Sequence, residues 1–436
     1  MEPVKIGIIG LGTVGCGTVE VLARNADEIA RRAGRGIHTK IVAVRDLGKP
    51  RGCDVAKLEL TSDPFAVVDH PDIQIVVELM GGNDLARELV LKSISNGKHV
   101  VTANKSLIAE HGNQIFAEAQ AQGVTVAFEA AVGGGISIIK VIREGLAGNR
   151  IEWLAGIVNG TANYVLTGMR DQGRDFQTML REAQRLGYAE ADPAFDIDGV
   201  DAAHKLTILA AIAFGIPLQF DKVYTEGISE LTREDILYAD ELGYRVKHLA
   251  LAIRTSDGIE LRVHPCLVPN TRLIANVEGV MNALVVKGDA VGETLHYGAG
   301  AGAEPTASAV VADLVDVVRV LTSDPNNRVP HLAFQPGALA DLPILPMADV
   351  KTAYYLRMNA LNRAGVLAEI TRILGDLEIS IEAVLQKRSR EGESTVPVIM
   401  LTQPTLERYM DQALQQIESL PAIAGKVMRI RVEGLQ

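Results

Sequence analysis

The sequence predicts an α/β fold, and three observations support this prediction. A short apolar strand opens the chain and leads through a glycine-rich turn into a helix. Strands and helices then alternate to about residue 130, and from residue 351 onward the order is strand, helix, strand, strand, helix, strand. Such alternation is typical of a doubly wound parallel sheet, and the final order is that of a ferredoxin-like unit.

The N-terminal turn has the spacing of a dinucleotide-binding loop. The predicted strand Val4 to Ile9 is followed by Gly10, Gly12 and Gly15. The first glycine permits a tight turn, the second leaves room for a pyrophosphate, and the third lets the helix approach the sheet. The start of the helix presents free N–H groups to the anion. We therefore predict a Rossmann-type domain whose cofactor contacts in this loop are Gly10, Gly12, Thr13, Val14 and Gly15.

The end of the second predicted strand carries both acidic and basic side chains. Arg45 precedes Asp46, and Lys49 and Arg51 follow closely. An acidic residue at this point binds the ribose 2′-hydroxyl of NAD, whereas arginine and lysine suit the 2′-phosphate of NADP. The sequence favours NADP through Arg45, and NAD stays open because Asp46 is an alternative contact.

Further strands of the same sheet are predicted in the segments IQIVVELM, GKHVVTANKSLIA and GVTVAFEAAVGGG. Ligands of such sheets lie beyond the carboxyl ends of the strands. Asn104, Lys105 and Glu129 occupy such positions in the sequence. We therefore expect Lys105 to contact both the nicotinamide and the substrate.

Residues 187–209 combine a run of carboxylates with a lysine. Asp201 and Lys205 are four residues apart on a helix predicted to begin near Val200, so both lie on one face, opposite a buried apolar stripe. An ammonium held beside a carboxylate in a partly dry cleft can give a proton to an oxygen that becomes negative. The alternative is a surface ion pair worth at most about 1 kcal/mol. The number of carboxylates in this short segment argues against a simple surface ion pair; they are Glu190, Asp192, Asp196, Asp198 and Asp201.

Three domains and a linker are predicted. The dinucleotide-binding domain comprises residues 1–137 plus 302–325, with Gly302 in a glycine-rich turn that could close over the cofactor. Residues 138–301 mix helices with alternating strands, which predicts an α+β substrate domain whose open sheet face pairs two subunits. Residues 326–350 are a predicted linker, because five prolines fall between Pro325 and Pro346. Residues 351–436 form the ferredoxin-like unit.

Composition disfavours several classes of partner. The 436 residues carry a net charge of −11, which argues against a nucleic-acid partner. No apolar run reaches the ~18 residues of a membrane helix, so we expect no membrane partner and a cytoplasmic location. Cys16, Cys53 and Cys266 are too scattered for a disulfide framework or a C-x-x-C metal site.

Seven motifs spread over the chain resemble homoserine dehydrogenase of the form with a C-terminal ACT domain. They are GLGTVG, TANKSLIA, FEAAVGGGIS, NGTANYVLT, GYAEADPAFDIDGVDAAHKLTIL, GAGAGAEPTASAVVAD and NRAGVLAEI. The resemblance implies reversible reduction of L-aspartate 4-semialdehyde to L-homoserine with NADPH or NADH. That reaction is a step toward threonine, methionine and isoleucine.

The resemblance also assigns roles to residues. Lys205 matches the family's general acid and base, and Lys105 matches its second active-site lysine. Glu190 matches the residue that binds the substrate amino group, with Asp196 and Asp201 in supporting acidic positions. The predicted cofactor contacts outside the N-terminal loop are Arg45, Lys105, Gly187 and Gly302.

A monovalent cation, sodium or potassium, is implied by the resemblance as well. One carboxylate and several backbone carbonyls would hold it. Oxygen-only ligation suits a hard cation, and glycines let carbonyls converge. The implied ligand positions are Glu129, Val132, Gly134 and Ile136.

The C-terminal motif NRAGVLAEI lies at a turn where a predicted strand leads into a helix N-terminus, a suitable place for the carboxylate of a small amino acid. Family habit suggests feedback inhibition by L-threonine at an interface between ACT units, in a homodimer or homotetramer. The predicted regulatory residues are Asn362, Ala364, Gly365, Val366 and Leu367.

Two other functions fit the residues less well. An aspartate semialdehyde dehydrogenase needs a cysteine nucleophile, and none of the three cysteines has the required context. A non-catalytic amino-acid sensor would keep the cofactor fold without turnover, and the intact lysines and carboxylates argue against such a loss.

Overall fold

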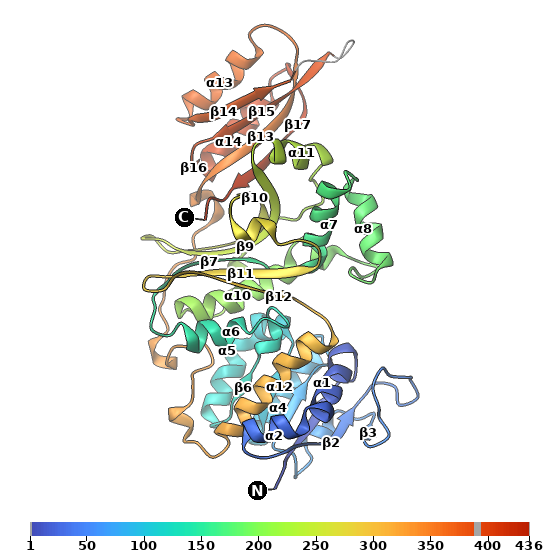
Figure 1. The fold of residues 1–436 in the computed structure, drawn as a ribbon. Coiled ribbons are helices and arrows are strands. Elements are labelled where there is room, and N and C mark those ends of the chain that lie inside the picture. Colours follow the sequence, from blue (N-terminus) through green and yellow to red (C-terminus); the bar gives the residue numbers. More distant parts are fainter. Residues whose placement is uncertain (1, 388–393, 436) are drawn as a thin grey trace. The chain divides into compact units, whose positions relative to one another are not determined.

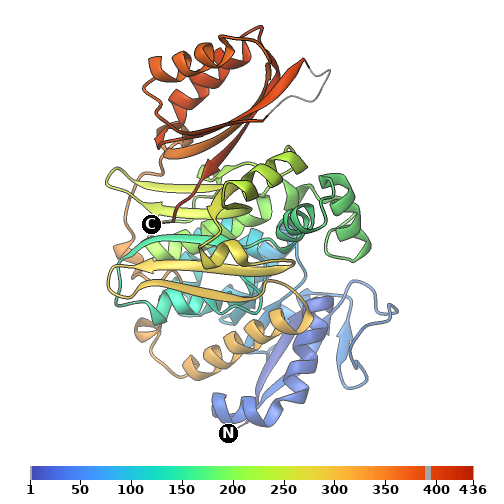
Figure 2. The same cartoon turned by 45° about the horizontal axis from the view of Figure 1, so that its top comes forward.

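The computed structural model describes residues 2–387 and 394–435 (Figure 1, Figure 2). The chain divides into two compact units. The first unit contains Met1–Gly160, Asp201–Val223 and Val280–Leu342. The second contains Thr161–Val200, Tyr224–Gly279 and Pro343–Gln436. These units do not coincide with the predicted functional domains, whose boundaries stay predictions.

A parallel six-stranded sheet forms the centre of the first unit, in the order β3-β2-β1-β4-β5-β6. This order is that of a Rossmann sheet and confirms the predicted α/β fold. The strands are β1 (Val4–Ile9), β2 (Ile37–Ala43), β3 (Glu59–Thr61), β4 (Ile75–Glu78), β5 (His99–Thr102) and β6 (Val126–Ala127). The helices around it are α1 (Thr13–Arg24), α2 (Ala26–Ala33), α3 (Phe65–Val68), α4 (Asp84–Ser95), α5 (Lys105–Ala121) and α12 (Ala303–Val320).

Burial explains the position of the central strands. Every residue of β4 and β5 is buried, as expected of parallel strands that helices cover on both faces. Ile6 and Ile8 of β1 share one apolar cluster with Val21 of α1 and Leu314 of α12. Helix α12 therefore packs beside α1 although most of the chain separates them in sequence (Figure 1).

An antiparallel sheet and a buried helix complete the first unit. The sheet has the order β12-β11-β7, and α10 begins at Val200 as predicted. Helix α10 is more buried than the predicted one-sided stripe, because Asp201 and His204 are also buried. The elements are β7 (Ile151–Ile157), β11 (Met281–Gly288), β12 (Gly292–Ala299), α6 (Ile138–Lys140), α10 (Val200–Phe214) and the short helical turns η1 (Glu129–Ala131), η2 (Val141–Gly145) and η3 (Phe220–Lys222).

The sheet of the second unit runs in the order β9-β10-β17-β13-β15-β14. Its strands are β9 (Tyr244–Arg254), β10 (Ile259–Pro269), β13 (Lys351–Leu361), β14 (Ile381–Gln386), β15 (Thr395–Thr402) and β17 (Ile423–Val432), with short β8 (Tyr224–Thr225) on β10 and β16 (Thr405–Leu406) on β13. The helices are α7 (Gly160–Asp171), α8 (Phe176–Arg185), α9 (Ala194–Ile197), α11 (Arg233–Glu241), α13 (Val366–Asp376) and α14 (Glu407–Glu418). The predicted ferredoxin-like order is confirmed as β13, α13, β14, β15, α14, β17, with β16 as an addition.

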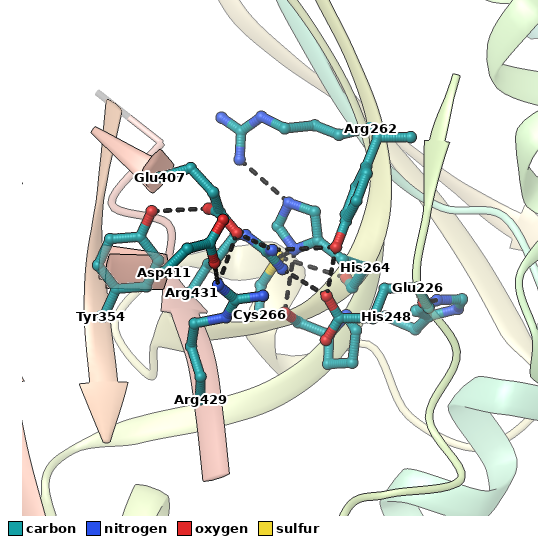
Figure 3. Close-up of polar contacts among 12 residues, drawn as sticks. Glu226, His248, Arg262, His264, Cys266, Tyr354, Glu407, Asp411, Arg429 and Arg431 are labelled. Atoms are coloured by element: carbon teal, nitrogen blue, oxygen red, sulfur yellow. Dashed lines mark hydrogen bonds and ion pairs between the residues drawn. The ribbon is translucent and has the colours of Figure 1, made fainter. Parts of the chain in front are cut away.

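Strand β17 links the two parts of this sheet through a fully buried arginine. It pairs antiparallel with β13 and, near its end, parallel with β10. Arg431 of β17 contacts Glu407 of α14, and its Nη1 lies 2.8 Å from Glu226 Oε2 (Figure 3). Two carboxylates therefore compensate a charge whose burial would otherwise be unfavourable.

A second arginine belongs to the same cluster. Arg262 of β10 pairs with Glu433, and its Nη1 donates to His264 Nε2 at 3.1 Å. His264, Cys266 and Glu433 offer metal-ligand atoms within 4.8 Å of one another. Because the Arg262 guanidinium already binds two of the three, this group serves ion pairing and a cation there would face a positive charge.

Among the described residues, no helix combines the length and apolar character needed to cross a membrane.

Candidate active site

The predicted lysine and carboxylate of α10 form a direct ion pair in the first unit. Lys205 Nζ lies 2.7 Å from Asp201 Oδ2, as the four-residue spacing predicts. The same ammonium donates to the carbonyl oxygen of Val158, also at 2.7 Å. Because two acceptors hold it and only 12% of its side chain is exposed, Lys205 has a fixed orientation.

Lys105 approaches the same carboxylate from another helix. Asn104 caps α5 by accepting a hydrogen bond from the Leu107 N–H, so Lys105 is the first residue of that helix. Lys105 Nζ lies 3.1 Å from Asp201 Oδ1. Asn159 donates to Asp201 Oδ2 at 2.9 Å. The fold therefore brings both predicted active-site lysines together around Asp201.

The charges of this group explain the state of Asp201. Burial by itself raises the pKa of a carboxyl group, but the ammonium groups of Lys205 and Lys105 hold the pKa of Asp201 well below its usual value. Asp201 is therefore ionised at neutral pH. One negative charge between two positive charges leaves the group with a net positive charge, which suits an oxygen that becomes negative in a reaction.

A polar network supports Lys105, and sequence reasoning missed most of it. Buried Glu78, at the end of β4, accepts from the N–H of Met80 at 2.9 Å and from the Thr102 hydroxyl at 2.7 Å. Thr102 in turn accepts from the N–H of Asn104 at 3.0 Å. Burial raises the pKa of Glu78. The sequence hinted at this network only through the positions of Glu78 and Thr102, each of which is the last residue of its strand in two neighbouring parallel strands.

The glycine loop borders a cleft of about 1030 Å³ in the first unit. The predicted cofactor residues among its lining are Gly10, Gly12, Thr13 and Arg45. Val14 and Gly15 follow on α1, and Gly302 lies one residue before Ala303, which also lines the cleft. The cleft therefore lies at the carboxyl end of the first strand, where a dinucleotide binds in folds of this type.

Backbone atoms leave no room for a side chain at two glycines of the loop. Gly10 has a φ of +101°, and a Cβ there would lie 2.6 Å from the carbonyl oxygen of Leu79. A Cβ on Gly15 would lie 2.3 Å from the carbonyl oxygen of Gly10. A Cβ on Gly12 would meet no atom of the described residues within 4 Å, so the backbone there faces open space.

Basic and acidic groups both line this cleft, at Arg45, Asp46, Lys49 and Arg51. Asp46 accepts from the N–H of Gly48 at 2.8 Å, and Arg51 donates to the carbonyl oxygen of Lys49 at 2.7 Å. These contacts fold the loop upon itself. Arg45 and Asp46 both line the cleft, so the geometry is compatible with either NADP or NAD as the cofactor.

The residues of the implied cation site lie close together in a turn that leads into α6. The two oxygens of Glu129 accept from the N–H groups of Ile139 and Lys140, at 2.9 and 2.8 Å. Burial raises the pKa of this carboxyl group to about 7. Gly133 and Gly134 have positive φ, so the carbonyls of this turn have unusual orientations. The donor set of one carboxylate and carbonyl oxygens fits a hard cation.

Other predicted residues belong to the second unit. Asp196 accepts a hydrogen bond from the Thr161 hydroxyl at 3.2 Å. Glu190 lies three residues after Gly187, whose φ is +78°. The carbonyl oxygen of Glu190 accepts from the side-chain amide of Gln184 at 3.1 Å, a contact that involves only its backbone.

The predicted regulatory turn is also in the second unit. Gly365 has a φ of +95° and precedes α13, which begins at Val366. The N–H of Asn362 donates to the carbonyl oxygen of Ser394 at 3.1 Å. Ala364 and Leu367 lie on either side of the helix start. The turn therefore leads into a helix N-terminus as predicted.

A Rossmann sheet with a dinucleotide loop, together with lysines around an ionised carboxylate, defines the class of nicotinamide-dependent dehydrogenases. Comparison with known families narrows this class. Residues 10–129 match "Homoserine dehydrogenase, NAD binding domain", residues 138–315 match "Homoserine dehydrogenase", and residues 354–421 match "ACT domain".

Individual relatives match this chain over its whole length. It is 63% identical to the homoserine dehydrogenase of Pseudomonas aeruginosa and 52% identical to that of Neisseria gonorrhoeae, and each alignment covers 100% of both proteins. The chain belongs to the homoserine dehydrogenase family and is an oxidoreductase.

Solved structures support the same assignment. A homoserine dehydrogenase from Thiobacillus denitrificans is 64% identical, with a TM-score of 0.95 over 100% of this chain and 99% of that chain. A hyperthermophilic archaeal homoserine dehydrogenase in complex with NADPH is 27% identical, with a TM-score of 0.62 over 72% of this chain and 97% of that chain.

Proposed function

We propose that this homoserine dehydrogenase interconverts L-aspartate 4-semialdehyde and L-homoserine with NADP as the preferred nicotinamide cofactor. The observation that carries the proposal is the group of Lys105, Asp201 and Lys205. NADP is favoured because Arg45 lines the cofactor cleft, and an archaeal relative has been solved with NADPH. The reaction would serve the synthesis of threonine, methionine and isoleucine.

The proposed chemistry assigns one task to each group. NADPH, when bound, supplies the hydride. Lys205 donates a proton to the oxygen of the aldehyde as that oxygen becomes negative, and Lys105 stabilises the same charge. Asp201 keeps both ammonium groups close together, since its two oxygens bind one lysine each. In the direction of homoserine oxidation, Lys205 accepts the proton.

The remaining assignments follow the family pattern. Glu190 binds the amino group of the substrate, and Asp196 supports it. The turn from Glu129 to Ile136 holds sodium or potassium, whose positive charge would lower the pKa that burial raises at Glu129.

Regulation and assembly are part of the same proposal. L-threonine binds the ACT turn at Asn362 to Leu367 and inhibits the enzyme. The chain acts in the cytoplasm as a homodimer or homotetramer. Measuring the molar mass in solution by light scattering, with and without threonine, tests the assembly.

The test of the proposed reaction is the initial rate of NADP and NAD reduction by L-homoserine at about pH 9, with and without millimolar threonine. We expect turnover that is faster with NADP and falls with threonine. Lys205→Ala should lose most of the turnover while it keeps cofactor binding. A rate that does not change between about pH 7 and 10 would contradict a lysine base.

A further inference from the structure

A second link joins the helices that carry the two lysines. His204 lies three residues after Asp201 on α10. The Nε2 atom of His204 is 2.9 Å from Glu110 Oε1 on α5. The imidazole is 3% exposed and stacks on Phe220 with ring centroids 4.1 Å apart and planes 9° from parallel. Stacking and burial leave this ring little freedom, so its contact with Glu110 has a defined geometry.

The second oxygen of Glu110 leads back to the start of α5. Asn83 Nδ2 donates to Glu110 Oε2 at 3.0 Å, and Asn83 Oδ1 accepts from the Ser106 hydroxyl at 2.8 Å. The same hydroxyl contacts Asn104 Oδ1 at 3.0 Å. Ser106 and Asn104 flank Lys105. A continuous chain of side chains therefore runs from α10 to the first turn of α5.

We propose that His204 and Glu110 are positioning residues that hold Lys105 at its distance from Asp201. Lys105 reaches Asp201 through a flexible side chain that is 33% exposed. A long lysine side chain has many rotamers, so this contact alone fixes the distance between the two helices less tightly than a stacked ring does. The contact between His204 and Glu110 supplies a second, more rigid attachment. A displacement of about 1 Å in a reacting group can cost on the order of a hundredfold in rate.

An exposed ion pair without influence on the site is the alternative. Glu110 is partly exposed, and a pair of that kind would contribute little. Against this stands the burial of His204 and the use of both Glu110 oxygens. The inference rests on the proposed roles of Lys105 and Asp201.

Kinetics of Glu110→Ala, His204→Ala and the double variant test the inference, with exposed Glu118→Ala on the same helix as the matched control. We expect each single variant to lower kcat for homoserine oxidation about tenfold. The KM for NADP should change less than kcat, because most of the predicted cofactor contacts are in the glycine loop and at Arg45. The double variant should lose no more than either single variant, since both act through one contact. His204→Gln keeps an N–H donor but loses the ring that stacks on Phe220, so it should restore only part of the kcat that His204→Ala loses.

Hydrogen exchange of the peptide covering residues 103–109 gives a readout that does not depend on turnover. Exchange should be faster in Glu110→Ala and His204→Ala than in the wild type, and unchanged in Glu118→Ala. Multiplicative losses in the double variant, or unchanged exchange in both single variants, would overturn the inference. A wild type that does not oxidise homoserine would instead refute the proposed function, and the exchange result would still decide the positioning role.

Discussion

Lys105 Nζ lies 3.1 Å from Asp201 Oδ1, while the other oxygen of Asp201 lies 2.7 Å from Lys205 Nζ. One buried carboxylate therefore connects the first residue of α5 with the first turns of α10. This relationship makes Asp201 responsible for both the position of the lysines and the balance of charge around them.

Asp201→Asn should lower kcat about a hundredfold, because the amide keeps the shape of the side chain but removes the charge that holds two ammonium groups together. Initial rates of homoserine oxidation measure the effect, and fluorescence titration with NADPH should show unchanged cofactor binding. Asp221→Asn is the matched control, since the side chain of Asp221 is 77% exposed. A kcat for Asp201→Asn within about threefold of that control would contradict the role of this carboxylate.

Two glycines of the dinucleotide loop should respond differently to the same substitution. Gly15→Ala places a Cβ 2.3 Å from the carbonyl oxygen of Gly10, so α1 must shift and the melting temperature should fall. Gly12→Ala meets no atom of the described residues within 4 Å, so stability should be unchanged. The added methyl group at Gly12 should nevertheless weaken NADPH binding about tenfold, because it occupies the space of the pyrophosphate.

Thermal unfolding and NADPH titration of both glycine variants separate the two effects. If Gly12→Ala bound NADPH as tightly as the wild type, the cofactor would not approach the backbone at this glycine, and the assignment of the loop would be wrong.

Arg45→Ser should reduce kcat/KM for NADP about tenfold and leave kcat/KM for NAD nearly unchanged, because only NADP carries the 2′-phosphate that an arginine binds. Lys57→Ser, an exposed residue of the same loop region, is the control. Equal losses with both cofactors would show that Arg45 does not distinguish them.

The sequence was sufficient where a local pattern determines the structure. The glycine spacing, the strand Val4–Ile9 and the four-residue spacing of Asp201 and Lys205 all specify short-range geometry. These features require only neighbouring residues, so no knowledge of the tertiary fold was needed.

The sequence was insufficient where the geometry depends on tertiary contacts. Neither the pairing of Lys105 with Asp201 nor the buried state of His204 is visible in one segment. The cluster around Arg431 was missed for the same reason, because its carboxylates come from separate elements (Figure 3). Burial of a charge becomes interpretable only when its partners are known.

Lys247 gives a prediction about pH and stability. This lysine of β9 is 2% exposed, and its Nζ donates to the carbonyl oxygen of Val277 at 2.5 Å. Burial lowers the pKa of its ammonium group to about 8, whereas an unfolded lysine titrates near 10.5. Between these two values the unfolded chain binds more protons than the folded chain. The contribution of Lys247 to the free energy of unfolding should therefore rise with pH through this window.

Lys247→Met removes the titrating group and isolates this effect. The difference in the free energy of unfolding between wild type and Lys247→Met should move in favour of the wild type by up to about 3 kcal/mol between pH 8 and 10.5. Urea unfolding at both pH values measures it. Lys287→Met, at a lysine whose side chain is 30% exposed, is the control and should show a much smaller change. A constant difference for Lys247→Met across this range would mean that the buried lysine keeps an ordinary pKa.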